Sequence, residues 1–274
     1  MNTTKAARDG YLIPFRSLIP FLLIAFGLAW GILGLFIFFP EPMAGLVGRL
    51  TGNHPLFYLC VYAPAIAAVT LVTYHGGIRG LKRFLSRFLL WRCPVAWYVF
   101  ILVGVPLVFI AGSALKGNLL AEPFPFTSIQ SLCVAMVLAL IKGPVEEFGW
   151  RGLLLPVLQR RLSPLWAGLV LGVIWGFWHL PAFLLSGTQQ SQWSFAPFFL
   201  GCIALSVIAT ALFNASRGSI LLSALFHFML MNPAFPDAAP YDTYLLVAIA
   251  VAVVWLNRGA MLTREGAIVA VVPG

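Results

Sequence analysis

A series of long apolar runs constrains this chain more than any other feature. Runs that approach or exceed about 18 residues recur along the whole sequence, and this is the length at which an apolar segment indicates a membrane-spanning helix. The composition agrees, because 61% of the 274 residues are hydrophobic and only 9% are charged, against about 25% charged in a soluble domain. We therefore predict an all-α, polytopic integral membrane protein.

Eight segments qualify as spanning helices. They are residues 17–39, 55–74, 95–115, 127–145, 164–185, 196–214, 218–235 and 242–257. The fourth is expected to continue through Glu146 toward Gln159 as a helix or a bend, and Pro144 and Pro181 are expected to kink or break their helices. The first run is longer than the apolar part of a signal peptide and is expected to be retained. Because the connectors and tails are short, we predict a single transmembrane domain over residues 1–274.

The distribution of Lys and Arg between the connectors predicts the orientation. With the N-terminus inside, fourteen basic residues fall on the cytoplasmic side and only Arg49 and Lys116 fall outside, while Lys142 stays unassigned. The cytoplasmic set is Lys5, Arg8, Arg16, Arg79, Lys82, Arg83, Arg87, Arg92, Arg151, Arg160, Arg161, Arg217, Arg258 and Arg264. Both termini are therefore predicted to be cytoplasmic. The net charge of +9 is explained by topology, so nucleic acid is not an expected partner.

A small set of ionisable residues lies within the apolar segments. An Arg, Lys or Asp at the centre of a membrane helix costs about 2.5 to 3.5 kcal/mol, so each needs a reason. Glu147 and Arg151 are four residues apart and share a helix face, which predicts an ion pair that orients Glu147. Glu146 points about 100° away around the helix axis. It is then the unpaired acid and a candidate general base.

Two of the four histidines also lie in apolar segments. His179 follows a Trp-rich run and His227 lies in LFHFMLMN. Either one alone is explained by a packed polar residue that bonds a backbone carbonyl. Together with Glu146, on three separate helices, they supply the acid, base and electrophile that a hydrolytic site needs.

The order of these residues resembles that of the CPBP family (CAAX proteases and bacteriocin-processing enzymes, also called Abi), which includes the type II CAAX prenyl proteases. EEFGWRG resembles its EExxxR motif, WGFWHLP its second motif with a histidine, and NASRGSILLSALFH the approach to its third motif. The resemblance covers about residues 130 to 235, and we place a catalytic core at 127–235. It implies an eight-helix intramembrane endopeptidase in which a glutamate and a histidine activate water.

The resemblance also implies a role for each matching residue. Glu146 and His179 would activate the water, Glu147 and Arg151 would brace the site, and His227 would face the scissile carbonyl. Two positions depart from the family pattern. Trp175 stands where the second motif usually has Phe, and Met231 stands where the third motif has Asn, with Asn232 one residue later. Either a helical bulge before Pro233 re-aims Asn232 as a second oxyanion donor, or that donor is missing.

Metal dependence is left open by the sequence. Glu146, His179 and His227 resemble a zinc ligand set. However, no HExxH motif is present, and one carboxylate does not easily serve as both a tight ligand and a general base. Water activation without a cofactor is favoured, and zinc is retained as the alternative.

The expected substrate is a peptide or a lipidated, CAAX-like protein, with membrane lipids as the surroundings, in a bacterial plasma membrane. Because Glu146 follows an inward-running helix, we expect the site near the cytoplasmic boundary, in a cavity open to that side. A catalytically silent scaffold or immunity protein of the same fold is the first alternative. A proton-coupled transporter is the second, and the absence of an inverted repeat counts against it.

Overall fold

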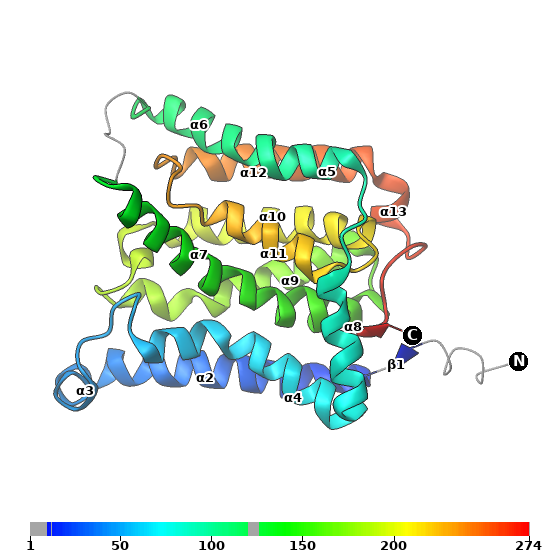
Figure 1. Ribbon diagram of the computed structural model, residues 1–274, viewed down its shortest axis with the longest axis horizontal. Helices are drawn as coiled ribbons and strands as arrows, with labels where there is room; N and C mark the ends of the chain where they lie inside the picture. The colour runs from blue at the N-terminus through cyan, green and yellow to red at the C-terminus, as the bar shows by residue number, and fades with distance from the viewer. Residues whose placement is uncertain (1–9, 12, 120–125, 274) are drawn as a thin grey trace, which may run out of the picture.

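The computed structural model describes residues 10–11, 13–119 and 126–273, and it is a bundle of helices that run side by side (Figure 1). Six helical segments are long and apolar enough to cross a membrane, and two shorter apolar helices follow them. The six contain α2 (Leu18–Phe38), α4 (Pro55–Leu85), α5 with α6 (Val95–Val99, Val105–Lys116), α7 with α8 (Ile129–Gly149, Leu155–Gln159), α9 (Pro164–Trp178) and α10 (Phe195–Ala215). The shorter two are α11 (Ile220–Leu230) and α12 (Tyr241–Leu256). The predicted all-α membrane fold is confirmed.

Helix boundaries differ from the predicted ones in two places. The second segment does not end at residue 74, because α4 runs to Leu85 and a 3-10 turn carries it to Leu89. The backbone kinks at Gly77, which has a φ of 57°, a conformation that glycine adopts without steric cost. The seventh segment is shorter than predicted, since α11 ends at Leu230. The remaining elements are the short helices α3 (Pro40–Val47) and α13 (Arg258–Leu262) and the strands β1 (Gly10–Tyr11) and β2 (Val272–Pro273).

The fourth segment continues past Glu146 and Glu147 as a helix, which is one of the two forms that the sequence predicts. After α7 the chain makes a π-helical turn, Trp150–Leu154, and then enters α8. Pro144 lies inside α7 without ending it, and the hydroxyl of Tyr62 donates to the carbonyl of Ile141 in the preceding turn at 2.9 Å. Such a bond from a neighbouring helix supports a backbone that proline has disrupted. Pro181, in contrast, lies just after the end of α9, in a 3-10 turn.

Two hydrophobic clusters fill the bundle. The first joins buried residues of α2, α4, the π-helical turn, α8 and α9 with a few of α10 and α11, and the second joins those of α6 and α10 to α13. In Figure 1 the α2–α4 pair forms one side of the bundle and the α6–α12 pair the other, with α7, α9, α10 and α11 between them. Glu146, Glu147 and His227 are buried on these central helices.

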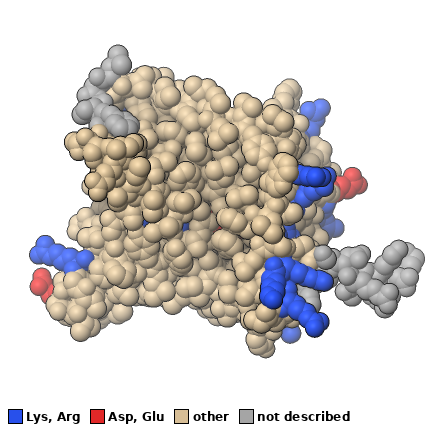
Figure 2. All heavy atoms as spheres, in the orientation of Figure 1, with Lys and Arg blue, Asp and Glu red and all other residues tan. Residues whose placement is uncertain are grey.

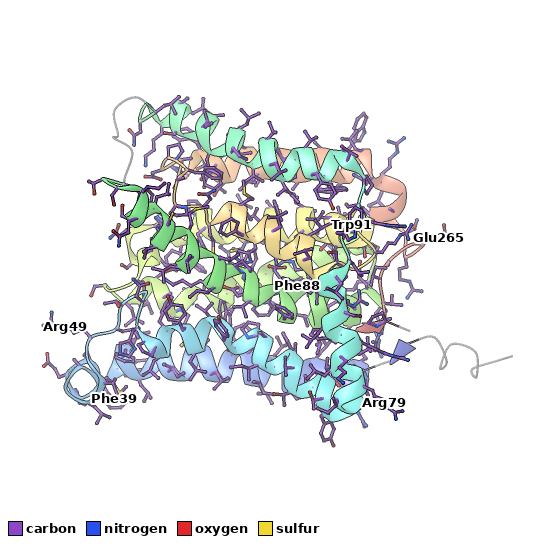
Figure 3. All side chains as sticks on the ribbon, viewed as in Figure 1. Phe39, Arg49, Arg79, Phe88, Trp91 and Glu265 are labelled. Atoms are coloured by element: carbon purple, nitrogen blue, oxygen red, sulfur yellow. The ribbon has the colours of Figure 1, made fainter. Side chains whose placement is uncertain are left out.

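Charged side chains gather at the ends of the bundle. Figure 2 shows Lys, Arg, Asp and Glu at its two ends, with an almost entirely uncharged face between them. Arg79 and Glu265 lie at the end that carries both chain termini, and Arg49 lies at the other (Figure 3). At the terminal end β1 pairs antiparallel with β2, and the buried Arg87 donates to the carbonyls of Gly218, Ala270 and Val271. The predicted cytoplasmic residues Lys5 and Arg8 lie outside the described part of the chain.

Candidate active site

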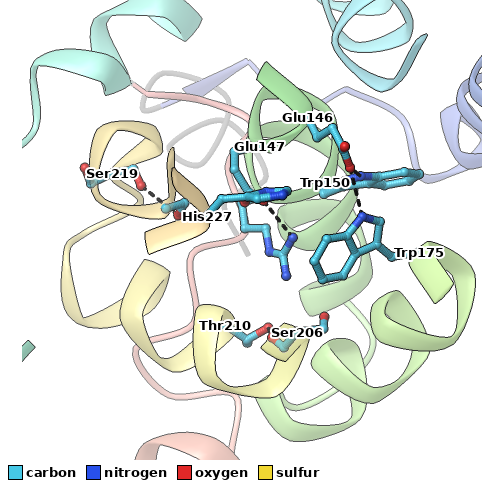
Figure 4. A network of polar contacts seen from close by, with 10 residues as sticks. Glu146, Glu147, Trp150, Trp175, Ser206, Thr210, Ser219 and His227 are labelled. Atoms are coloured by element: carbon cyan, nitrogen blue, oxygen red, sulfur yellow. Dashed lines mark hydrogen bonds and ion pairs between the residues drawn. The ribbon is translucent and has the colours of Figure 1, made fainter. Parts of the chain in front are cut away.

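The carboxylate of Glu146 is held by two indole groups. Its Oε2 accepts from Nε1 of Trp150 at 3.1 Å and from Nε1 of Trp175 at 2.9 Å, and the side chain is buried (Figure 4). Trp150 follows on the next helical turn, in the π-helical segment, and Trp175 comes from α9. Among the ion pairs of the described residues, none includes Glu146. The acid therefore has no cationic partner, as predicted, but it is oriented by two neutral donors that the sequence did not reveal.

Glu147 contacts both Arg151 and His227 through one carboxylate oxygen. Its Oε1 accepts from the guanidinium of Arg151 at 3.0 Å, and it lies 2.7 Å from Nδ1 of His227 on α11 (Figure 4). All three side chains are buried. The predicted Glu147–Arg151 pair is thus present, and it extends to His227, which the spacing alone did not indicate. A carboxylate held by Arg is ionised and can only accept, so Nδ1 of His227 carries a proton.

His179 lies at the end of α9, where its own backbone closes the helix. Its Nδ1 lies 2.9 Å from the carbonyl of Trp175. A carbonyl can only accept, so Nδ1 is protonated, and in the neutral ring Nε2 presents a lone pair. Trp178 and Phe198 contact the ring edge-to-face at 4.8 and 5.0 Å between centroids. His179 is therefore fixed in the tautomer that a water-activating base requires.

Trp175 contacts four other members of the site. It donates to Glu146, accepts from His179 through its carbonyl, and its ring lies 5.4 Å from that of His227 and 5.0 Å from the Arg151 guanidinium carbon. The second motif of the family usually has Phe at this position. The sequence did contain a sign of the role of Trp175, because Trp has a hydrogen-bond donor in its ring and Phe has none.

The third motif does not take the first of its two predicted forms, in which a bulge re-aims Asn232. Helix α11 is regular to Leu230 and then ends, so no helical bulge precedes Pro233. Asn232 lies beyond the helix, where its side-chain oxygen accepts from the backbone N–H of Ala234 at 3.0 Å. The side chain of Met231 instead lies against His227, since a Cβ built on Gly143 would meet both residues. The expected re-aiming of Asn232 by a bulge is wrong, because the helix stops before Asn232 is reached.

The donor set does not form a metal centre in this arrangement. Within the described ranges, no three His, Cys, Asp or Glu side chains converge to hold an ion. Glu146 uses Oε2 for two indole groups, and Nδ1 of His179 and of His227 are taken by a carbonyl and a carboxylate. These bonds leave Oε1 of Glu146 and Nε2 of both histidines, the atoms that zinc would use, because metal-ligating histidines commonly donate their other ring nitrogen in this way. Glu146, His179 and His227 nevertheless do not converge as a ready ligand set in this arrangement.

Glu146 lies deeper in the bundle than we expected from the sequence. Thirteen further residues, 147–159, stay helical after it, which corresponds to about 20 Å of helix at 1.5 Å per residue. The charged run EEFGWRG therefore does not mark the end of the span. The π-helical turn and α8 carry the chain onward because Leu153, Leu154 and Leu155 are all buried in the first hydrophobic cluster.

Comparison with known proteins finds similarity over the same part of the chain that carries the candidate site. Residues 128–231 match the family described as type II CAAX prenyl endopeptidase Rce1-like. This range includes Glu146, His179 and His227 and ends at Met231. The chain is also similar to the CAAX prenyl protease 2 of Methanococcus maripaludis, with 25% identity over 224 residues that cover 74% of this chain and 82% of the relative. The segment that carries the three motifs therefore matches the Rce1-like, type II CAAX prenyl endopeptidase family, and this match together with the relative supports a peptidase of this type.

Proposed function

We propose that this protein hydrolyses peptide bonds of a membrane-associated or prenylated, CAAX-like substrate, with water activated by Glu146 and His179. The observation that carries the proposal is a buried glutamate in a membrane helix, held by the indole N–H groups of Trp150 and Trp175, beside a histidine locked in one tautomer through Trp175. Placing an ionisable group inside a membrane span costs free energy, so a residue of this kind usually has a function. The family match to residues 128–231 supports the reaction class.

The geometry supports a division of labour between the two oxygens of Glu146. Both indole groups donate to Oε2, so Oε1 is the oxygen that takes one proton from water. Nε2 of His179 accepts a hydrogen bond from the second hydrogen, which stays on the water oxygen. The water oxygen then bonds to the scissile carbonyl carbon. When the carbon–nitrogen bond breaks, the proton held by Glu146 passes to the leaving amine. One carboxyl thus acts first as base and then as acid.

The Glu147–Arg151–His227 group suits the developing oxyanion. His227 donates through Nδ1 to Glu147, and donation to an oxyanion through Nε2 requires a cationic ring. Glu147, 2.7 Å away, stabilises that cation, and Arg151 keeps Glu147 ionised. In this proposal His227 stabilises the oxyanion, and Glu147 and Arg151 position His227. We further propose a plasma-membrane location in a bacterium, with both termini cytoplasmic.

The proposal is tested with protein purified in detergent and a farnesylated peptide that ends in a CAAX sequence. Glu146→Gln and His179→Ala are expected to lower turnover by about 10² to 10⁴-fold, the usual contribution of general acid–base catalysis, with normal accumulation of protein. Glu147→Ala and Arg151→Ala are expected to lower both turnover and accumulation, because each leaves a buried charge without its partner. Glu41→Gln, an exposed carboxylate on α3, is the matched control.

Near-normal turnover of Glu146→Gln would remove Glu146 from the role of general base. If the wild-type protein cleaves no peptide but Met231→Asn gains cleavage, the natural protein is the catalytically silent scaffold. Met231 is the specific observation that favours this second function, since it occupies the place beside His227 where the family pattern has Asn.

A further inference from the structure

Lys142 lies within a membrane helix and, in the described part of the chain, forms no ion pair with an acidic side chain. Its Nζ donates to Oδ1 of Asn53 at 2.7 Å and lies 5.2 Å from the ring centroid of Tyr58. Over the residues that the structure describes, the ion pairs do not include Lys142. Two buried arginines differ from Lys142 in their partners. Arg151 forms an ion pair with Glu147, and Arg87 donates to three backbone carbonyls. A half-exposed ammonium without an acidic partner in such a helix is a candidate functional group.

Lys142 lies next to the residues of the proposed active site. It lies four residues before Glu146, so both side chains share one face of α7, a helical turn apart. The next residue, Gly143, contacts His227 so closely that an added Cβ would meet the imidazole ring. Asn53 belongs to the loop before α4, and the neighbouring Gly52 donates its backbone N–H to the carbonyl of Gly187, in the segment after His179. The loops next to two site elements therefore meet beside Lys142.

The chemistry of this group suits a carboxylate. The ammonium has three donors, one of which is used by the neutral amide oxygen of Asn53. An anionic acceptor could take another donor in a charge-assisted hydrogen bond. Glu146 would repel a substrate carboxylate that approached without such a cation. Because one helical turn spans 5.4 Å and an extended peptide about 3.3 Å per residue, a carboxylate on Lys142 would place the bond over Glu146 within the last few residues of a peptide.

We propose that Lys142 and Asn53 form a subsite for the free C-terminal carboxylate of the substrate, and that this subsite restricts cleavage to the carboxyl end of the peptide chain. The inference rests on the proposed peptidase function and extends it by naming the group that selects the substrate. It also gives a role to the one basic residue that the charge distribution left unassigned.

The test compares two farnesylated peptides that end in Cys-Val-Ile-Met, one with a free carboxylate and one with a C-terminal amide. The wild-type protein is expected to favour the acid over the amide by about ten- to a hundredfold in kcat/KM, which is the range for one charge-assisted hydrogen bond. Lys142→Met should reduce this ratio to near one, whereas Lys142→Arg should retain most of it. Mass spectrometry should place the cut within the last few residues.

Asn53→Asp gives a sharper variant, because it leaves Lys142 intact and places a carboxylate where the amide now accepts. The internal acid is expected to compete with the peptide carboxylate and to reduce the ratio as Lys142→Met does. Lys116→Met is the matched control, since Lys116 lies in the last turn of α6 and is already paired with Asp237. It should leave the ratio unchanged.

Binding of the same two peptides to Glu146→Gln, measured by fluorescence anisotropy, separates the subsite from catalysis. If no peptide is cleaved but the acid binds at least tenfold more tightly and Lys142→Met removes the difference, the subsite stands and the proposed peptidase function fails. If both peptides are cleaved and bound equally well, or if Lys142→Met keeps the preference, the carboxylate subsite is wrong while the peptidase stands.

Discussion

At the scale of single residues, the indole nitrogen of Trp175 donates a hydrogen bond to Glu146, which a phenyl ring at this position could not do. It gives Glu146 one of its two hydrogen bonds, at 2.9 Å, in a position where the buried carboxylate has no cation. A hydrogen bond to a charged group contributes about 1.5 to 3 kcal/mol. The same residue packs against His179 and His227, so its ring and its nitrogen have separable roles.

Trp175→Phe tests the nitrogen alone, since the aromatic contacts are kept. We expect turnover to fall by about ten- to a hundredfold with little change in KM, because the lost bond orients the base rather than the substrate. Steady-state kinetics with the farnesylated peptide measure this. Trp30→Phe is the control, because Nε1 of Trp30 donates to the carbonyl of Trp178 instead. A large rise in KM with unchanged kcat would show that Trp175 contacts substrate and does not position Glu146.

The third motif allows a second prediction at this scale. Asn232 bonds locally to Ala234, whereas Met231 lies beside His227. We therefore expect Asn232→Ala to change turnover less than about threefold, and Met231→Asn to raise it by about tenfold or more, within the range for an added oxyanion donor. Both are read from kcat. A hundredfold loss in Asn232→Ala would mean that the segment after α11 rearranges when substrate binds.

At the scale of elements, the acidic helix depends on a close crossing with its neighbour. A Cβ on Gly149 would lie 2.5 Å from backbone and side-chain atoms of Pro64, in the middle of α4. The π-helical turn begins one residue later and carries Trp150, which holds Glu146. The crossing and the turn together fix where the carboxylate points.

Gly149→Ala is therefore expected to destabilise the protein by about 1 to 3 kcal/mol, because a backbone contact cannot move aside for the new methyl group. The midpoint of thermal unfolding in detergent measures the loss. Gly27→Ala on α2 is the control, since nothing lies within 4 Å of its added Cβ. An unchanged midpoint in Gly149→Ala would show that α4 and α7 are not held together at this point.

At the scale of the whole molecule, the predicted orientation can be tested at the two charged ends of the bundle. Lys82 is exposed at the end that carries the chain termini, and Ser194 is exposed in the connector before α10. In the part of the chain that the structure describes, Cys60 and Cys202 are buried, and burial raises the pKa of the Cys93 thiol to about 11. Cys93 therefore carries little thiolate near neutral pH and reacts slowly.

Introduced cysteines test the orientation with a membrane-impermeant maleimide on intact cells. Ser194→Cys is expected to label and Lys82→Cys to label only after the cells are opened, in a background where the natural cysteines are replaced. The reverse pattern would invert the topology. The result also decides from which side a peptide reaches Lys142, because the Asn53 loop lies near Arg49, at the end opposite the termini (Figure 3).

The sequence by itself determined the all-α membrane fold and the Glu147–Arg151 pair, and it located the apolar helices, six of which are long enough to span a membrane and two of which are shorter. It also singled out Glu146, His179 and His227 as candidate site residues. These follow from local rules, since hydropathy over about 20 residues and a spacing of four along one helix need no knowledge of the neighbours. Only the tertiary structure decided that Trp175 orients Glu146, that Glu147 also holds His227, and that Asn232 falls outside α11. Those contacts join side chains 29 and 80 residues apart, or depend on where a helix ends against its neighbours, and both are set by packing rather than by any local pattern.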